Sequence, residues 1–88
     1  MSTKADFWER YGYVVGSKNR KIVLRTLDRP YTPLELAKKT GLGMNLTSRA
    51  LRELDKQAIV VCRNPDAKMG RVYELSELGK KIVKESEI

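Results

Sequence analysis

The sequence is poor in the residues on which many enzymes and metal sites depend. It contains no histidine and a single cysteine, Cys62, among 88 residues. A disulfide needs two cysteines and an ordinary zinc site needs about four Cys or His ligands, so one chain can form neither. Catalytic arrangements built on histidine are excluded as well, and the six glycines match neither GxGxxG nor a P-loop. We therefore expect no cofactor and no enzymatic activity.

Long apolar runs are also absent. No stretch approaches the ~20 apolar residues that span a bilayer, and residues 1–6 are too polar for a secretory signal. We therefore expect a cytoplasmic protein with no membrane partner. The length suits a single domain, 1–88, with a modest hydrophobic core.

Positive charge is what the sequence has in excess. Lys and Arg number 18 against 11 Asp and Glu, which gives a formal net charge of +7. Such a surplus favours polyanionic partners such as nucleic acid, with acidic membrane surfaces as the alternative.

Hydrophobic spacing and capping residues predict helices in the first third of the chain. The N-terminal aromatic segment, 1–16, is spaced for a short helix that Gly12 and Gly16 are expected to interrupt. Ser17 is a good N-cap for a second helix, which runs to about Asp28.

The strongest local signal follows at Thr32. Thr32 is suited to the N-cap, Pro33 to the first helical position, and Glu35 to the third position of a capping box. Gly41 is expected to end this short helix in a left-handed conformation. A tight turn then leads into another periodic segment, 45–56, so the sequence predicts two helices that cross steeply.

The segment 45–56 has two contrasting helical faces. One face is small and aliphatic and is expected to be buried, whereas the other is polar and cationic. The first face comprises Thr47, Ala50, Leu51 and Leu54, and the second comprises Asn45, Ser48, Arg49, Arg52 and Lys56.

The last third of the chain predicts a β-hairpin and a helix. Residues 59–62 are apolar and mostly β-branched, turn formers follow, and 72–75 reads as a returning strand, which together give a hairpin over 59–75. Ser76 is expected to cap a final helix, 76–88. The predicted fold class is α+β and mostly helical.

This order of elements resembles the archaeal and bacterial winged helix-turn-helix transcriptional regulators of the ArsR/MarR-like superfamily, over roughly residues 17–86. The resemblance implies a helical core, 17–58, a wing hairpin, 59–75, and a C-terminal helix after the wing. The motifs that carry the resemblance are Thr32 to Leu42 for the first helix and the turn of the helix-turn-helix, and Asn45 to Leu54 for the recognition helix. Ile59-Val60 then leads into the wing, and Leu75 to Gly79 leads out of it.

The resemblance implies a DNA-binding transcriptional regulator that reads the major groove with the helix 45–56. We expect Arg49 to be the principal base contact, because a guanidinium donates two hydrogen bonds to guanine. An alternative for Arg49 is that it only pairs with Glu53 at i+4. An alternative for Asn45 is that it caps the helix that follows Gly43 and is then not available to bases. The implied base-reading residues are Asn45, Leu46, Ser48, Arg49 and Arg52, of which Arg52 can reach either a base or a phosphate.

The resemblance also implies contacts from the wing segment, 63–71, to the DNA backbone or the minor groove. Arg63, Lys68 and Arg71 flank its tip, although such charges also serve to keep an edge strand soluble. Thr32 and the amide groups at its helix start are further phosphate candidates, since helix N-termini attract anions.

Partners other than DNA follow from the hydrophobic surface. The aromatic residues Phe7, Trp8 and Tyr11, together with the apolar face of the C-terminal helix, exceed what a small core needs, so we expect a homodimer. The alternative is that these aromatics fold back onto their own domain. A function of another class is a winged-helix module for protein interaction or architecture, with only non-specific nucleic-acid binding. We expect Cys62 to be a core residue, not a redox switch.

Overall fold

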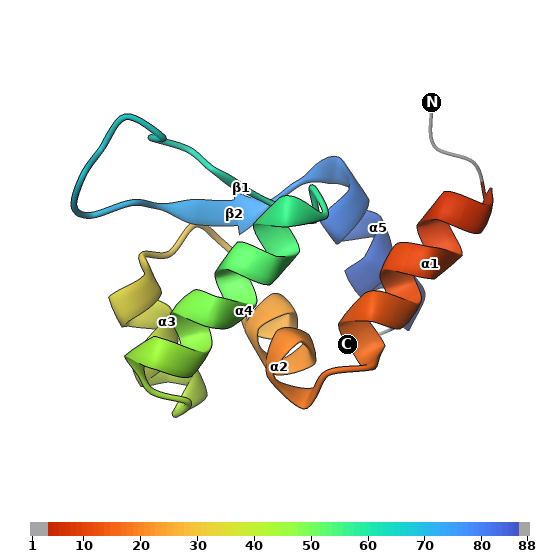
Figure 1. Cartoon of the computed structure of the whole chain (residues 1–88), viewed down its shortest axis with the longest axis horizontal. Coiled ribbons are helices and arrows are strands. Elements are labelled where there is room, and N and C mark those ends of the chain that lie inside the picture. Colours follow the sequence, from red (N-terminus) through yellow and green to blue (C-terminus); the bar gives the residue numbers. More distant parts are fainter. Residues whose placement is uncertain (1–3, 87–88) are drawn as a thin grey trace.

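The computed structural model describes residues 4–86 and shows an α+β chain that is mostly helical. Five helices and one antiparallel hairpin of two strands occur among these residues (Figure 1). The parts of the expected segments 1–16 and 76–88 that fall on residues 1–3 and 87–88 lie outside the described range. In chain order the elements are α1 (Lys4–Val15), α2 (Lys18–Thr26), α3 (Pro33–Thr40), α4 (Met44–Lys56), β1 (Val60–Cys62), β2 (Tyr73–Leu75) and α5 (Glu77–Ser86).

Local capping residues start and end the central helices as the sequence predicts. The Ser17 side chain caps α2 by accepting a hydrogen bond from the Arg20 amide. At the start of α3 the Thr32 hydroxyl accepts from the Glu35 amide at 3.2 Å, and the Glu35 carboxylate accepts from the Thr32 amide at 2.8 Å. Gly41 ends α3 in the left-handed region at φ 75°. The predicted capping box and stop are confirmed.

Helix α1 differs from its prediction. It runs without a break through Gly12 and ends before Gly16, so the expected interruption at Gly12 is wrong. A glycine inside a helix costs only about 1 kcal/mol, and tertiary packing overrides a penalty of that size. Here Val14 is fully buried, and Phe7 and Tyr11 of the same helix pack against the core.

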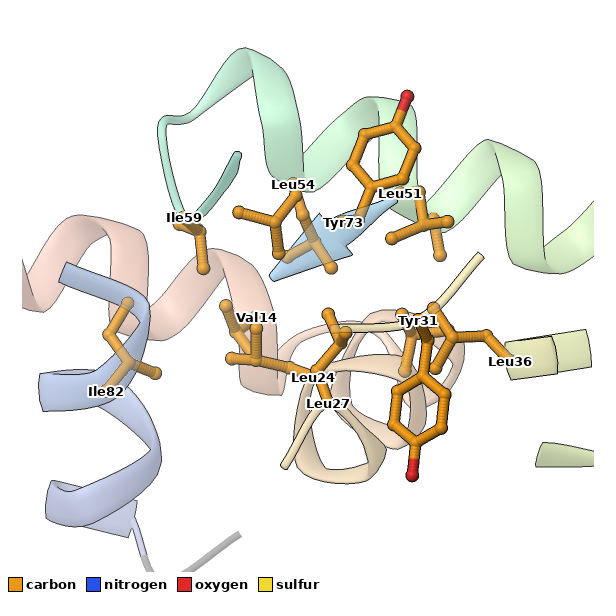
Figure 2. Packing of buried hydrophobic residues seen from close by; sticks show 13 residues of the cluster. Val14, Leu24, Leu27, Tyr31, Leu36, Leu51, Leu54, Ile59, Tyr73 and Ile82 are labelled. Atoms are coloured by element: carbon orange, nitrogen blue, oxygen red, sulfur yellow. The ribbon is translucent and has the colours of Figure 1, made fainter. Parts of the chain in front are cut away.

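Helix α4 begins one residue earlier than predicted, at Met44. Its N-cap is Gly43, with φ 82° and no side-chain capping bond, so Asn45 does not cap the helix and lies exposed in its first turn. The apolar face packs against α2 and α3, and Figure 2 shows Leu51 and Leu54 pointing from α4 toward the α2 residues in the core. The fully or nearly buried residues of α4 are Thr47, Ala50, Leu51 and Leu54, as predicted.

The hairpin is tied to the helices by an additional backbone contact. β1 and β2 pair antiparallel, with Val60 opposite Leu75 and Cys62 opposite Tyr73. Tyr31, which precedes α3, bridges to Tyr73: the Tyr31 amide donates to the Tyr73 carbonyl at 3.0 Å, and the Tyr73 amide donates back at 2.8 Å. This contact, which the sequence does not predict, fixes the hairpin beside the start of α3.

A second close contact joins α5 to the residues before β1. The Ser76 hydroxyl accepts a hydrogen bond from the Gly79 amide at 3.0 Å, which confirms Ser76 as the cap of α5. The same hydroxyl lies 2.7 Å from the Ala58 carbonyl oxygen and 2.9 Å from that of Ile59. Gly79 is buried directly against Ile59, and a methyl group added at position 79 would overlap the Ile59 carbonyl oxygen.

We expect Gly79→Ala to lower the free energy of unfolding by about 1–3 kcal/mol, the usual cost of overpacking a close contact. The added methyl group meets backbone atoms, which cannot move aside as a flexible side chain does. Urea denaturation followed by circular dichroism would measure the loss as a lower midpoint.

Gly12→Ala is the matched control, because a methyl group there meets nothing within 4 Å. In this case alanine should raise stability by about 0.5–1 kcal/mol, since glycine in a helix interior is entropically costly. Equal midpoints for the two variants would contradict the close-contact explanation of Gly79.

Candidate nucleic-acid interface

The outward face of α4 carries polar and cationic side chains. Its opposite face is held in the core, so these side chains are turned toward solvent. The Arg49 side chain is 73% exposed, which leaves it accessible to a ligand. Of the predicted base-reading residues, Asn45, Leu46, Arg49 and Arg52 are exposed and Ser48 is half-buried.

Arg49 has a partner within the protein, as the alternative interpretation expects. Its Nε lies 3.7 Å from Glu53 Oε2, one helical turn further along α4. An ion pair this long and this exposed contributes little stability, typically about 0–1 kcal/mol. The contact involves Nε, so the two terminal nitrogens of the guanidinium remain for another acceptor.

Glu53 is shared with a second arginine that the sequence does not single out. Arg20 of α2 places Nη1 3.2 Å from Glu53 Oε1, and its side chain is only 16% exposed. Its Nε donates to the Tyr13 carbonyl at 2.8 Å, and its guanidinium lies 3.8 Å from the centre of the Tyr13 ring. Arg20 therefore positions the Glu53 carboxylate, with which Arg49 also pairs.

Three of the predicted site residues meet in one shallow hollow. Ser48 and Arg52 of α4 line it together with Arg71, which precedes β2. Pro33, the first residue of α3, forms another part of the rim, so Thr32 is adjacent in the chain. The structure thus brings the start of α3, the middle of α4 and the base of the hairpin loop to one surface.

In the hairpin loop, residues 63–72, the Arg71 side chain donates hydrogen bonds to the backbone of the same loop. Arg71 Nε donates to the Ala67 carbonyl at 2.9 Å, and Nη2 donates to the Pro65 carbonyl at 3.3 Å. The Arg71 side chain is exposed to solvent, although two of its nitrogens already donate to backbone carbonyl groups of the loop. Its main structural role is therefore to shape the loop, a role that the sequence does not reveal.

The other two predicted loop cations differ in their partners. Arg63 Nε lies 3.7 Å from Glu74 Oε2 in an exposed ion pair. Lys68 is exposed and makes no ion pair or hydrogen bond with any residue of the range 4–86. Of the three, Lys68 is the cation most available to a polyanion.

Thr32 lies at the N-terminus of α3, where an internal anion is already present. The Glu35 carboxylate accepts the Thr32 amide proton. This backbone hydrogen bond, followed by that with the Thr32 side chain, holds the pKa of Glu35 below its usual value. A phosphate that approaches the N-terminus of α3 would therefore meet the negative charge of the Glu35 carboxylate, which already interacts with the positive end of the helix dipole.

Comparison with known protein families, curated proteins and solved structures found no match to this chain. In the range 4–86, no helix has the length and apolarity required to cross a membrane. The same residues bring no three Cys, Asp or Glu side chains together in a group that could hold a metal ion.

Glu35→Gln should change how stability depends on pH. Because the pKa of Glu35 is lowered in the folded chain, its ionised form contributes stability above the unfolded pKa, and this contribution is lost as pH falls through the folded pKa. We expect the wild type to lose stability relative to Glu35→Gln as pH falls from about 5 through the unfolded and then the lowered folded pKa. Denaturation midpoints of both proteins across this range would measure the difference.

Glu85→Gln, on the exposed side of α5, controls for the loss of one negative charge. A stability difference between wild type and Glu35→Gln that stays constant with pH would show that the capping carboxylate contributes nothing through its charge.

Proposed function

We propose that the fold is a winged helix-turn-helix and that the protein is a cytoplasmic transcriptional regulator that binds double-stranded DNA. In this proposal α3 and α4 form the helix-turn-helix, α4 enters the major groove, and the hairpin is the wing that contacts the neighbouring backbone or minor groove. The observation that carries the proposal is the burial of Thr47, Leu51 and Leu54, which leaves the cationic face of α4 outward.

The dimensions and chemistry of α4 suit the major groove. The helix has 13 residues, and a groove about 12 Å wide admits a single α-helix. Arg49 offers its terminal nitrogens to guanine O6 and N7, whereas Leu46, which is 43% exposed, suits contact with a thymine methyl group. Asn45 is free for a base because Gly43 takes the cap position.

The wing supports backbone contacts in the proposed complex. The bridge from Tyr31 to Tyr73 keeps the hairpin beside the helix pair, so wing and α4 can approach one duplex together. Lys68 and Arg63 supply positive charge on this loop. Such contacts position the protein on DNA without reading its sequence.

Arg49→Ala should reduce discrimination between the preferred duplex and a duplex with the contacted guanine replaced. A good bidentate pair contributes about 1–3 kcal/mol of discrimination, so we expect a loss of roughly 5- to 150-fold. A preferred sequence would first be selected from a random DNA pool, and fluorescence anisotropy would then give the dissociation constants.

Lys68→Ala is the contrasting variant. It should weaken binding to all duplexes alike and reduce the slope of log K against log salt by about one, because a phosphate contact carries no sequence information. If Arg49→Ala also weakened every sequence equally, base reading by Arg49 would be wrong. Absence of any preferred sequence would favour the architectural module instead.

We propose that the regulator forms a homodimer through its N-terminal aromatic residues. The apolar face of α5, the other expected contact, is occupied within its own chain, where Ile82 is buried and Leu78 and Val83 pack against the core. Phe7, Tyr11 and Tyr13 pack against the core of their own chain, which agrees with the folded-back alternative for most of the aromatic segment. Trp8, however, is 50% exposed, and its ring makes T-shaped, edge-to-face contacts with the rings of Phe7 and Tyr11. This exposed ring supports pairing with a second copy.

Sedimentation equilibrium at micromolar concentration should give twice the chain mass for the wild type and the chain mass for Trp8→Glu. A glutamate at the centre of a paired surface would place a charge in an apolar contact, which is strongly unfavourable. A wild-type protein with the mass of one chain would contradict the homodimer.

A further inference from the structure

The hairpin loop displays one large apolar side chain to solvent. Met69 is 88% exposed, more than any other large hydrophobic residue of the described chain. Figure 1 shows the loop between β1 and β2 extending beyond the helices. A single exposed apolar residue is common on protein surfaces. The loop around Met69 is held by hydrogen bonds from two of its own side chains.

Two side chains fix the shape of this loop from inside. The Asn64 side chain accepts from the Val72 amide at 2.7 Å and donates to the Gly70 carbonyl at 3.1 Å. Arg71 donates to two further carbonyls of the same loop. Gly70, next to Met69, has φ +68°, a conformation that other residues rarely adopt. These contacts hold the tip in a defined form without covering Met69.

The hairpin loop carries three cations, Arg63, Lys68 and Arg71, against one anion, Asp66, and this surplus of positive charge favours a polyanion. Lys68 precedes Met69 and has no partner within residues 4–86, and Arg71 follows two residues later. Arg71 also lines the hollow that contains Ser48 and Arg52 of α4. The base of the loop therefore adjoins the outward face of α4, and a duplex contacted by that face lies within reach of the tip.

We propose that Met69 is an apolar wedge that enters the minor groove, inserts between two base pairs and bends the duplex. This inference rests on the proposed DNA binding and names the part of the site that deforms DNA. Proteins that bind the minor groove use Arg, Lys, Asn or Gln to read it and frequently insert apolar side chains, methionine included, between base steps, which kinks the duplex. A preformed loop suits this role because the wedge must unstack a base step without itself collapsing.

Bending and unstacking can be measured on the same complexes. A duplex of about 25 base pairs with a central TA step, which is easily kinked, would carry a fluorophore pair at its ends and 2-aminopurine at the step. On binding of wild-type protein, energy transfer should report a bend of roughly 20–90°, and 2-aminopurine fluorescence should rise.

Met69→Gln keeps the length of the side chain and removes its apolar character. Both signals should be lost, while the salt slope stays unchanged because no charge is altered. Met69→Leu should retain the bend. The matched control is Val15→Gln, since Val15 is also an exposed apolar residue, 38% accessible, but lies at the end of α1, outside the elements proposed to contact DNA, and should leave bending intact.

The outcomes separate this inference from the proposed function. Saturable duplex binding without bending, or equal bending by wild type and Met69→Gln, would refute the wedge and leave DNA binding standing. Absence of saturable binding by anisotropy would refute both. Met69-dependent binding to phosphatidylglycerol vesicles by a protein that leaves DNA straight would assign the loop to a lipid surface and overturn the proposal.

Discussion

Burial of the apolar face of α4 is the interaction on which the rest of the structure depends. Leu51 and Leu54 lie in the core against α2 and α3, and the rotation of the helix about its axis is set by them. Turning α4 by half a turn would bring Arg49 and Arg52 into the core, where unpaired charges are very costly. The packing that stabilises the fold thus also determines which side chains solvent and ligands meet.

Much of the fold could be predicted because its signals are local. Ser17, Thr32 and Gly41 mark helix ends through contacts within three or four residues, and the periodicity of 45–56 identifies both of its faces. Gly12 misled the prediction because a weak local penalty was overridden by the packing of α1. Sequence alone left two roles open for Asn45, and the cap position of Gly43, with its positive φ, excludes the capping role.

The candidate site was less predictable, because its geometry depends on residues distant in the chain. Arg20 and Glu53 are 33 positions apart and lie on different helices, so no periodicity links them. The bridge between Tyr31 and Tyr73 likewise joins residues that are far apart in the chain, so no local pattern indicates it. The types of residue on α4 and the hairpin loop could be inferred from the sequence, but the residues that pair with them could be identified only in the folded chain.

The internal use of arginine has a consequence for the electrostatic reach of the molecule. Arg20 is held by Glu53 and Tyr13, and Arg71 is occupied by carbonyl groups of its own loop. Both arginines count toward the net charge of +7, but each also stabilises the fold through contacts within the chain. Glu53 compensates the charge of Arg20, whose side chain is only 16% exposed, so Arg20 adds less to the field that a polyanion meets than composition implies, whereas the neutral carbonyl groups leave the charge of Arg71 uncompensated.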